Sequence, residues 1–231
     1  MQNITISFGI IILFSILWSI IMLFLFLIRW ISSIIIPSFS APIEVDLRQN
    51  KNQHGRKILL CAVKANPLKS IYFGHIWVVW PEATPFSNGI KEAGFYAYNR
   101  IHAFLDIILA IIAPFGIFFK QKPLKGIMRN DEGLHRDWQI SIEIDEENYQ
   151  KALEIDNLWR NESRYSLRPA KDGCTYNCRD YVYEIANILG LKTKYYGWWD
   201  FPSHMFLSLL QANNLQIITP NRQFFGRLAR A

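Results

Sequence analysis

The chain has 231 residues, of which 51% are hydrophobic and 15% aromatic, so one domain with a sizeable core is possible. The net charge is +6, but the basic residues are dispersed beside apolar sequence and form no nucleic-acid motif, which favours an anionic lipid surface over nucleic acid as the partner. Three cysteines, Cys61, Cys174 and Cys178, are too few for a disulfide scaffold.

The N-terminal segment is predicted to be a membrane anchor over residues 1–30. Residues 8–28 are apolar except for two serines. At ~1.5 Å per residue, a helix of this length crosses the ~30 Å hydrocarbon layer. Arg29 and Trp30 then supply an interfacial pair. An uncleaved anchor is favoured over a signal peptide, because the segment has no basic start and no small-residue cleavage site.

The charge around this span favours a single-pass protein with a cytoplasmic C-terminal domain. No Lys or Arg precedes the span, whereas several follow it, and positive charge marks the cytoplasmic flank. Residues 31–56 are predicted to be a tether. Pro37 and Pro42 interrupt regular structure there, and mostly polar residues follow.

Residues 57–231 are predicted to form one α+β domain. Runs rich in Ile, Val and Trp, or alternating between apolar and polar residues, indicate strands. Apolar residues at helical spacing indicate helices, and Gly190 stands where a helix-ending glycine is expected. The predicted strands are Lys57–Ala65, Ile71–Trp80, Glu92–Asn99, Trp138–Ile144 and Tyr165–Leu167, and the predicted helices are Glu146–Asn161, about 178–189 and about 202–210.

A second apolar run, residues 101–119, contains His102, Asp106, Pro114 and Gly116. An Asp near the centre of a spanning helix costs about 2.5–3.5 kcal/mol, and less near an end. The sequence leaves four possibilities for this run: a second span, a re-entrant hairpin, an interfacial helix or a buried core helix.

Cys178 is the cysteine for which a chemical role is considered. Cys174 and Cys178 have no second Cys/His pair at zinc-ribbon spacing, so no metal site is predicted. A disulfide between them requires Cys174 to lie outside the helix. Alternatively, Cys178 is simply a small buried apolar residue, which is the usual role of a single cysteine. However, Cys178 is placed at a helix N-terminus, where the helix dipole and free N–H groups stabilise a thiolate.

A nucleophilic thiol needs a base within hydrogen-bonding reach. Among the five histidines, His75 differs because it lies within a predicted strand. A strand histidine is often only structural, but the preceding Gly74 leaves space for a close approach.

Two stretches then define a resemblance. The first is Gly74-His75-Ile-Trp77-Val, followed after a turn by Glu92-Ala-Gly-Phe-Tyr96, and the second is Tyr176-Asn-Cys178-Arg-Asp-Tyr-Val-Tyr-Glu-Ile-Ala. They resemble the circularly permuted branch of papain-like thiol hydrolases. That branch is related to NlpC-type cell-wall peptidases and includes lecithin:retinol acyltransferase and bacterial amidase-like proteins. In this family a strand histidine precedes an Asn-Cys at a helix start, which inverts the order in papain.

The resemblance implies an antiparallel papain-like sheet packed on helices, with His75 as general base, Cys178 as nucleophile and no cofactor or metal. The family often has a third polar residue on the strand after the histidine. Glu92 and Tyr96 lie on the face of the predicted strand that is suited to orienting His75, and the sequence does not decide between them. The run 101–119 becomes an insertion between the two motifs. A single crossing by it would separate His75 from Cys178, so membrane-surface contact near the site is favoured.

The predicted function is therefore that of a membrane-anchored cysteine hydrolase (amidase or peptidase) or acyltransferase. By resemblance, its partners are membrane lipid and a peptide, peptidoglycan or lipid substrate. Two alternatives stay open. One is a non-catalytic binding or scaffold protein on the same fold, and the other is a two-span protein in which His75 and Cys178 are core residues. The oligomeric state is not indicated.

Overall fold

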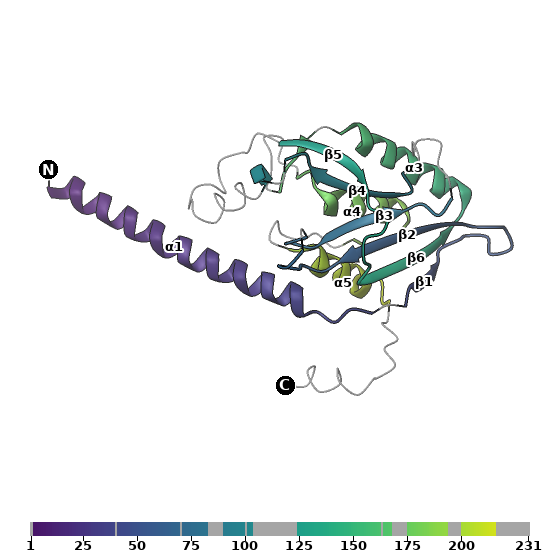
Figure 1. Ribbon diagram of the computed structural model, residues 1–231, viewed down its shortest axis with the longest axis horizontal. Helices are drawn as coiled ribbons and strands as arrows, with labels where there is room; N and C mark the ends of the chain where they lie inside the picture. The colour runs from purple at the N-terminus through teal and green to yellow at the C-terminus, as the bar shows by residue number, and fades with distance from the viewer. Residues whose placement is uncertain are drawn as a thin grey trace, which may run out of the picture.

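A computed structural model describes residues 2–39, 41–69, 71–82, 90–99, 101–103, 124–162, 164–167, 175–193 and 200–215. Within these residues an N-terminal apolar helix leads into an α+β domain built on a seven-stranded sheet (Figure 1). The helices are α1 (Gln2–Ile35), α3 (Glu146–Asn161), α4 (Cys178–Ile188) and α5 (Pro202–Ala212). The strands are β1 (Ile43–Asp46), β2 (Arg56–Val63), β3 (His75–Val79), β4 (Glu92–Ala97), β5 (Leu124–Asn130), β6 (Trp138–Ile144) and β7 (Arg164–Tyr165).

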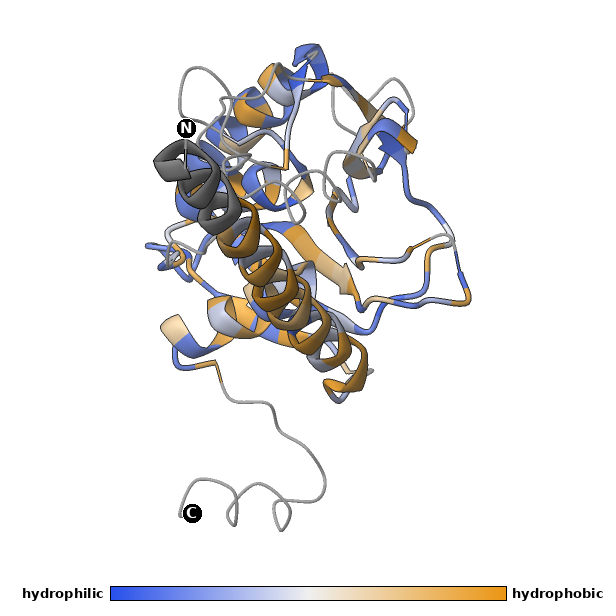
Figure 2. Cartoon of the chain, turned by 90° about the vertical axis from the view of Figure 1, so that its left-hand side faces the viewer, coloured by the Kyte–Doolittle hydropathy of each residue, from blue (hydrophilic) through white to orange (hydrophobic). Residues whose placement is uncertain are grey.

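The first helix, α1, has 34 residues and projects away from the sheet (Figure 1). Its segment Ile12–Ile35 is long and apolar enough to span a membrane. Figure 2 shows hydrophobic residues around the whole circumference of its described part. A helix that is apolar on every side but largely exposed is stable in lipid and unfavourable in water.

The predicted tether is wrong in part, because residues 31–56 contain regular structure. The first helix continues to Ile35, and β1 pairs in parallel with β6. Ile43 and Val45 pack against the core and alternate with exposed residues, as in a half-buried strand. The sheet is therefore mixed, whereas an antiparallel sheet was predicted.

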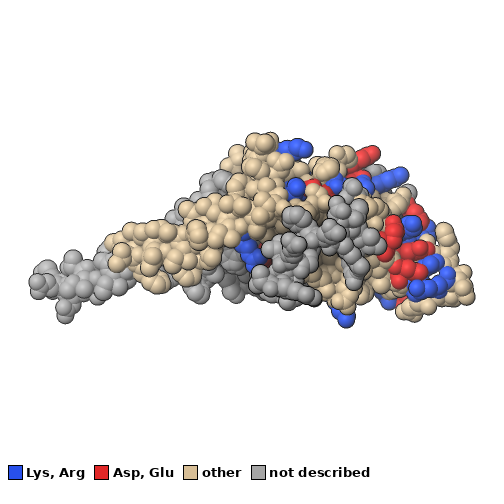
Figure 3. Space-filling view, turned by 90° about the horizontal axis from the view of Figure 1, so that it is seen from below, with Lys and Arg blue, Asp and Glu red and all other residues tan. Residues whose placement is uncertain are grey.

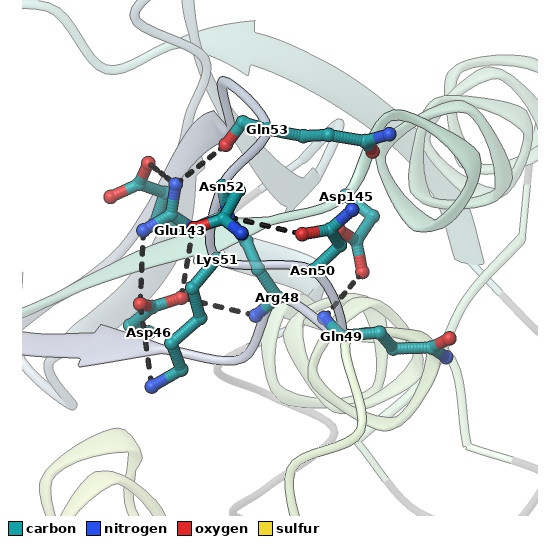
Figure 4. Close-up of polar contacts among 9 residues, drawn as sticks. All are labelled: Asp46, Arg48, Gln49, Asn50, Lys51, Asn52, Gln53, Glu143 and Asp145. Carbon is teal, nitrogen blue, oxygen red and sulfur yellow. Dashed lines mark hydrogen bonds and ion pairs between the residues drawn. The ribbon is translucent and has the colours of Figure 1, made fainter.

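The connection from β1 to β2 is also fastened to the domain (Figure 4). Arg48 forms ion pairs with Asp46 at 3.0 Å and with Glu143 of β6 at 3.1 Å. The backbone N–H of Gln49 donates to Asp145 Oδ2 at 2.8 Å. These contacts explain why a polar segment in which no strand was expected is nevertheless ordered against the sheet.

The strand order is β1-β6-β2-β3-β4-β5-β7, and every neighbouring pair except β1–β6 is antiparallel. One face of the sheet packs with α3, α4 and α5 to form the main core. A smaller apolar cluster, made of Cys61, Val63, Trp77 and Val79, belongs to the other residue parity of β2 and β3.

Several predicted elements are confirmed by the structure. The bounds of α3 and β6 coincide with their predicted ranges. Gly190 ends α4 with a φ of 85°, and Leu191 N–H bonds Ala186 O at 3.0 Å, which closes the helix in a Schellman motif. β3 is shorter than predicted because Gly74, at a φ of 80°, ends a turn immediately before His75. Of the apolar run 101–119, residues 104–119 lie outside the described part of the chain.

Candidate active site

Cys178 is the first residue of α4, as predicted, and its exposed fraction is 8%. The helix starts there because Asn177 forms a capping box with Asp180. The Asn177 side chain accepts hydrogen bonds from the N–H groups of Arg179 and Asp180. This cap uses the N–H groups of the second and third helical residues, so the N–H of Cys178 itself lies at the front of the helix dipole.

His75 begins β3, where it is paired in register with Val63, and its exposed fraction is 3%. The turn ending at Gly74 sets where the strand starts, and a side chain at Gly74 would collide with the Val63 carbonyl. The space beside Gly74 is therefore taken up by the backbone of residues 63–65. It does not leave room for another group to approach His75, although such room was predicted. The structure brings His75 and Cys178 close enough for Cys178 to raise the pKa of His75, through hydrogen bonding and charge.

Asp131 is the third member of the cluster, and it was not among the residues predicted from the sequence. Its Oδ2 lies 2.9 Å from Nε2 of His75, and both side chains are almost fully buried. Asp131 directly follows β5, and its N–H bonds Glu92 O at 2.9 Å, which fixes it beside β4. Since Nε2 faces Asp131, Nδ1 is the ring nitrogen left for Cys178.

Of the two residues considered for the orienting role, Tyr96 lies at the site and Glu92 has other partners. The Tyr96 ring stacks on His75 with centroids 4.2 Å apart, and its hydroxyl donates to Asp131 Oδ1. Glu92 instead binds Arg136 at 2.5 Å and accepts from Trp77 Nε1 at 3.2 Å. The orienting group is thus a carboxylate whose second oxygen is held by Tyr96.

Gly94 makes room for this arrangement. A Cβ at Gly94 would overlap both Asp131 Oδ2 and His75 Nε2, so the His75–Asp131 hydrogen bond passes directly over this glycine. A glycine inside a strand marks a close approach by another group. This glycine was the available sequence signal for Asp131, which stands beside other charged residues near His135.

Burial shifts the pKa of His75 in one direction, and its hydrogen bonds and the nearby charges shift it in the other. Desolvation alone lowers its pKa, but the hydrogen bonds to Asp131 and Cys178, with the charges of both groups, outweigh burial and raise the pKa from 6.5 to about 9. The imidazolium form therefore prevails at neutral pH. Its contribution to folding stability is complete below pH 6.5 and is lost as the pH rises through about 9.

We expect the His75 ring to titrate with a midpoint near 9, because two acceptors stabilise its charged form. NMR of the ring nitrogens in histidine-labelled protein measures this directly, with His75→Gln to assign the signal. A midpoint at or below the ordinary 6.5 would show that Asp131 and Cys178 do not hold the cation.

Arg29 and Trp30 of α1 contact the segment before His75 directly and the segment of Cys178 through Asp200. Trp30 Nε1 donates to Tyr72 O at 2.8 Å, three residues before His75. Arg29 lies 3.5 Å from Asp200, and Arg179, the neighbour of Cys178, donates to the Asp200 carbonyl. The pair is therefore built beside the end of the candidate membrane helix.

Cys61 and His204 are not part of this cluster. Burial raises the pKa of Cys61 to about 12, and Cys174 lies outside the described residues. His204 Nε2 lies 2.8 Å from Ser32 Oγ, away from the pair. Within the described ranges, no group of three or more His, Cys, Asp or Glu side chains could hold a metal ion.

Comparisons with protein-family models, with curated proteins and with solved structures give no match. The resemblance to permuted papain-like hydrolases therefore depends on the two short motifs alone.

Proposed function

We propose that this protein is a membrane-anchored cysteine hydrolase or acyltransferase of the permuted papain-like type. The observation that carries the proposal is the buried His75, which bonds Asp131 at 2.9 Å and whose pKa is also raised by the thiol of Cys178, the first residue of a helix. Such a nucleophile, base and orienting acid form a catalytic triad. A purely structural histidine needs neither a thiol partner nor a helix dipole beside that thiol.

In the proposed reaction, His75 already holds the proton of Cys178 on Nδ1 as an imidazolium, and the Cys178 thiolate attacks the carbonyl carbon of an amide or ester. The tetrahedral oxyanion collapses and expels the amine or alcohol, which receives the proton from His75. The resulting thioester is then attacked by water in a hydrolase, or by an acceptor amine or alcohol in an acyltransferase. In that step, His75 removes the proton of the attacking group.

Two groups of the site stabilise the charges that form during this reaction, on the oxyanion and on the imidazolium. The N–H of Cys178 is the proposed oxyanion donor, since Asn177 caps the following N–H groups of the same turn. Asp131 holds Nε2, and so keeps the ring oriented and stabilises the imidazolium after proton transfer.

The anchor favours a substrate at the membrane surface. Residues 1–30, with a span of about 8–28, would hold the domain against one leaflet, and the charge distribution favours the cytoplasmic side. Lipid, peptide and peptidoglycan acyl groups all contain a carbonyl that the site could attack.

An electrophilic thiol probe tests the proposal on the purified full-length protein in detergent. We expect Cys178 to be labelled much faster than Cys61, because Cys61 is fully buried and its pKa is raised to about 12. Peptide mapping identifies the modified thiol and also reports on Cys174. In His75→Ala the labelling of Cys178 should fall about 10²–10⁴-fold, the usual contribution of a general base.

Cys178→Ala gives the background of the assay. Equal labelling of Cys61 and Cys178, or a rate at Cys178 that does not respond to His75→Ala, would favour the non-catalytic scaffold on the same fold.

A further inference from the structure

We propose that the domain carries a second membrane contact, a docking surface formed by Leu68, Tyr72, Tyr98 and Ile101. We infer that this surface seats in the interface of the same bilayer that α1 crosses. The inference rests on α1 as the anchor and is independent of the cysteine chemistry.

The distribution of exposed apolar side chains points to this surface. Outside α1, the described residues contain five large apolar side chains that are strongly exposed. Four of them form the docking surface: Leu68 is 95% exposed, Tyr72 54%, Tyr98 56% and Ile101 69%. The fifth, Leu158, is 64% exposed and lies on α3. Single exposed apolar residues need no explanation, but a group at one place marks an interaction site.

The sheet topology places these four residues at one end. β3 begins at His75 and its antiparallel neighbour β4 ends at Ala97, so the loop before β3 and the segment after β4 leave the sheet on the same side. The first segment carries Leu68 and Tyr72, and the second carries Tyr98 and Ile101. Figure 1 shows that this end of the sheet is turned toward α1, with the short helical piece at residues 101–103 on the same side.

α1 fixes the depth of this end relative to a bilayer. Trp and Tyr side chains concentrate at the headgroup level, and Arg29 and Trp30 are the residues of α1 suited to that level. Trp30 donates its indole hydrogen bond to the carbonyl of Tyr72, so the loop before β3 meets α1 at this level. Leu68 lies only four residues earlier in the same loop.

The loop holds Leu68 outward in a defined conformation. The N–H of Leu68 donates to Asn66 Oδ1 at 2.9 Å, and Asn66 N–H donates to Ile71 O at 3.0 Å. Asn66 thus closes a turn, with Pro67 and Leu68 at its exposed tip. A tip that faces water is ordinarily polar, whereas a fixed apolar tip suits a lipid interface.

The charges of the domain agree with this orientation. Lys69 is exposed next to Leu68, and Lys125 Nζ lies 4.7 Å from the centre of the Tyr98 ring. Lysines beside apolar and aromatic side chains favour anionic headgroups. In the face seen in Figure 3, acidic and basic side chains gather toward the end opposite α1.

The docking surface adjoins the candidate active site. Tyr72 precedes His75 by three residues, which span at most ~10 Å. If the surface seats in the headgroup layer, the His75 backbone lies within ~10 Å of that layer, close to where a membrane-bound substrate would be presented.

The test measures the depth of a single fluorescent label in full-length protein reconstituted into vesicles that contain anionic lipid. The background is Cys174→Ser with Cys178→Ala, and the fully buried Cys61 is kept. Leu68→Cys and Ile101→Cys carry an environment-sensitive dye, Leu158→Cys is the matched control on α3, and the background protein alone gives residual labelling. Circular dichroism verifies that each variant is folded, and Tyr72→Cys replaces either docking variant that is not.

We expect the labels at positions 68 and 101 to emit at shorter wavelength than the label at 158. They should be quenched by spin-labelled lipid and protected from iodide in the water. Labels at 68 and 101 that iodide quenches as strongly as the label at 158 would overturn the docking surface, even with Cys178 fully reactive. Conversely, an unreactive Cys178 would leave this result unchanged.

Discussion

Asp131→Asn should reduce turnover, and the labelling rate of Cys178, by about 10²–10⁴-fold, which corresponds to about 3–5 kcal/mol of activation free energy. The substitution keeps the shape of the side chain and an oxygen that can accept from Tyr96. It removes the negative charge that faces His75 Nε2 at 2.9 Å. The His75 pKa should therefore fall from about 9 toward its ordinary 6.5, because one of the contributions that raises it is lost.

The pH dependence of stability supplies a second readout for this variant. The native protein holds His75 as imidazolium up to about pH 9, and that contribution to stability should shrink in Asp131→Asn. The difference in unfolding free energy between the two proteins should be largest below about pH 6.5 and decrease as the pH rises through 9.

Asp137→Asn is the matched control. Asp137 is as buried as Asp131, at 4% exposure, but accepts from the Lys64 backbone N–H at 2.9 Å and does not contact His75. It should affect stability and leave Cys178 reactivity unchanged. If Cys178 were labelled at the same rate in Asp131→Asn and Asp137→Asn, the proposed role of Asp131 would be excluded.

Gly94→Ala should inactivate the site and destabilise the domain together. Its Cβ would occupy the space where His75 Nε2 and Asp131 Oδ2 meet, so that the hydrogen bond has to lengthen or break. Overpacking of this kind costs about 1–3 kcal/mol of folding free energy. With Asp131 displaced, the labelling rate of Cys178 should fall at least as far as in Asp131→Asn. Urea unfolding followed by circular dichroism and the thiol-probe assay measure the two effects.

Gly133→Ala separates loss of stability from loss of the site. Gly133 has a φ of 84°, and no neighbouring atom lies within 4 Å of a Cβ placed there. This variant is strained by roughly 1 kcal/mol, since an alanine disfavours a positive φ. It should unfold more easily than the native protein and still react normally at Cys178. Full reactivity in Gly94→Ala would show that the close approach is not needed.

The sequence by itself determined the elements whose signal is local. Hydrophobic periodicity defined α3 and β6, because a helix face and a strand face each have a fixed repeat. α1 was visible because a membrane span needs only a continuous apolar run of sufficient length, which the sequence shows directly. Cys178 at a helix start and His75 in a strand also followed from residue order and spacing, with the resemblance supplying the link between them.

Only the tertiary structure decided which groups meet. Asp131 lies in a charged stretch, and nothing local distinguishes it from Glu132. It becomes buried because β4 and β5 pair, which carries it along Gly94 to His75. β1 joins the sheet through a parallel pairing with β6, a contact between segments almost a hundred residues apart. Such pairings depend on the register between distant strands, and periodicity within one segment contains no information about register.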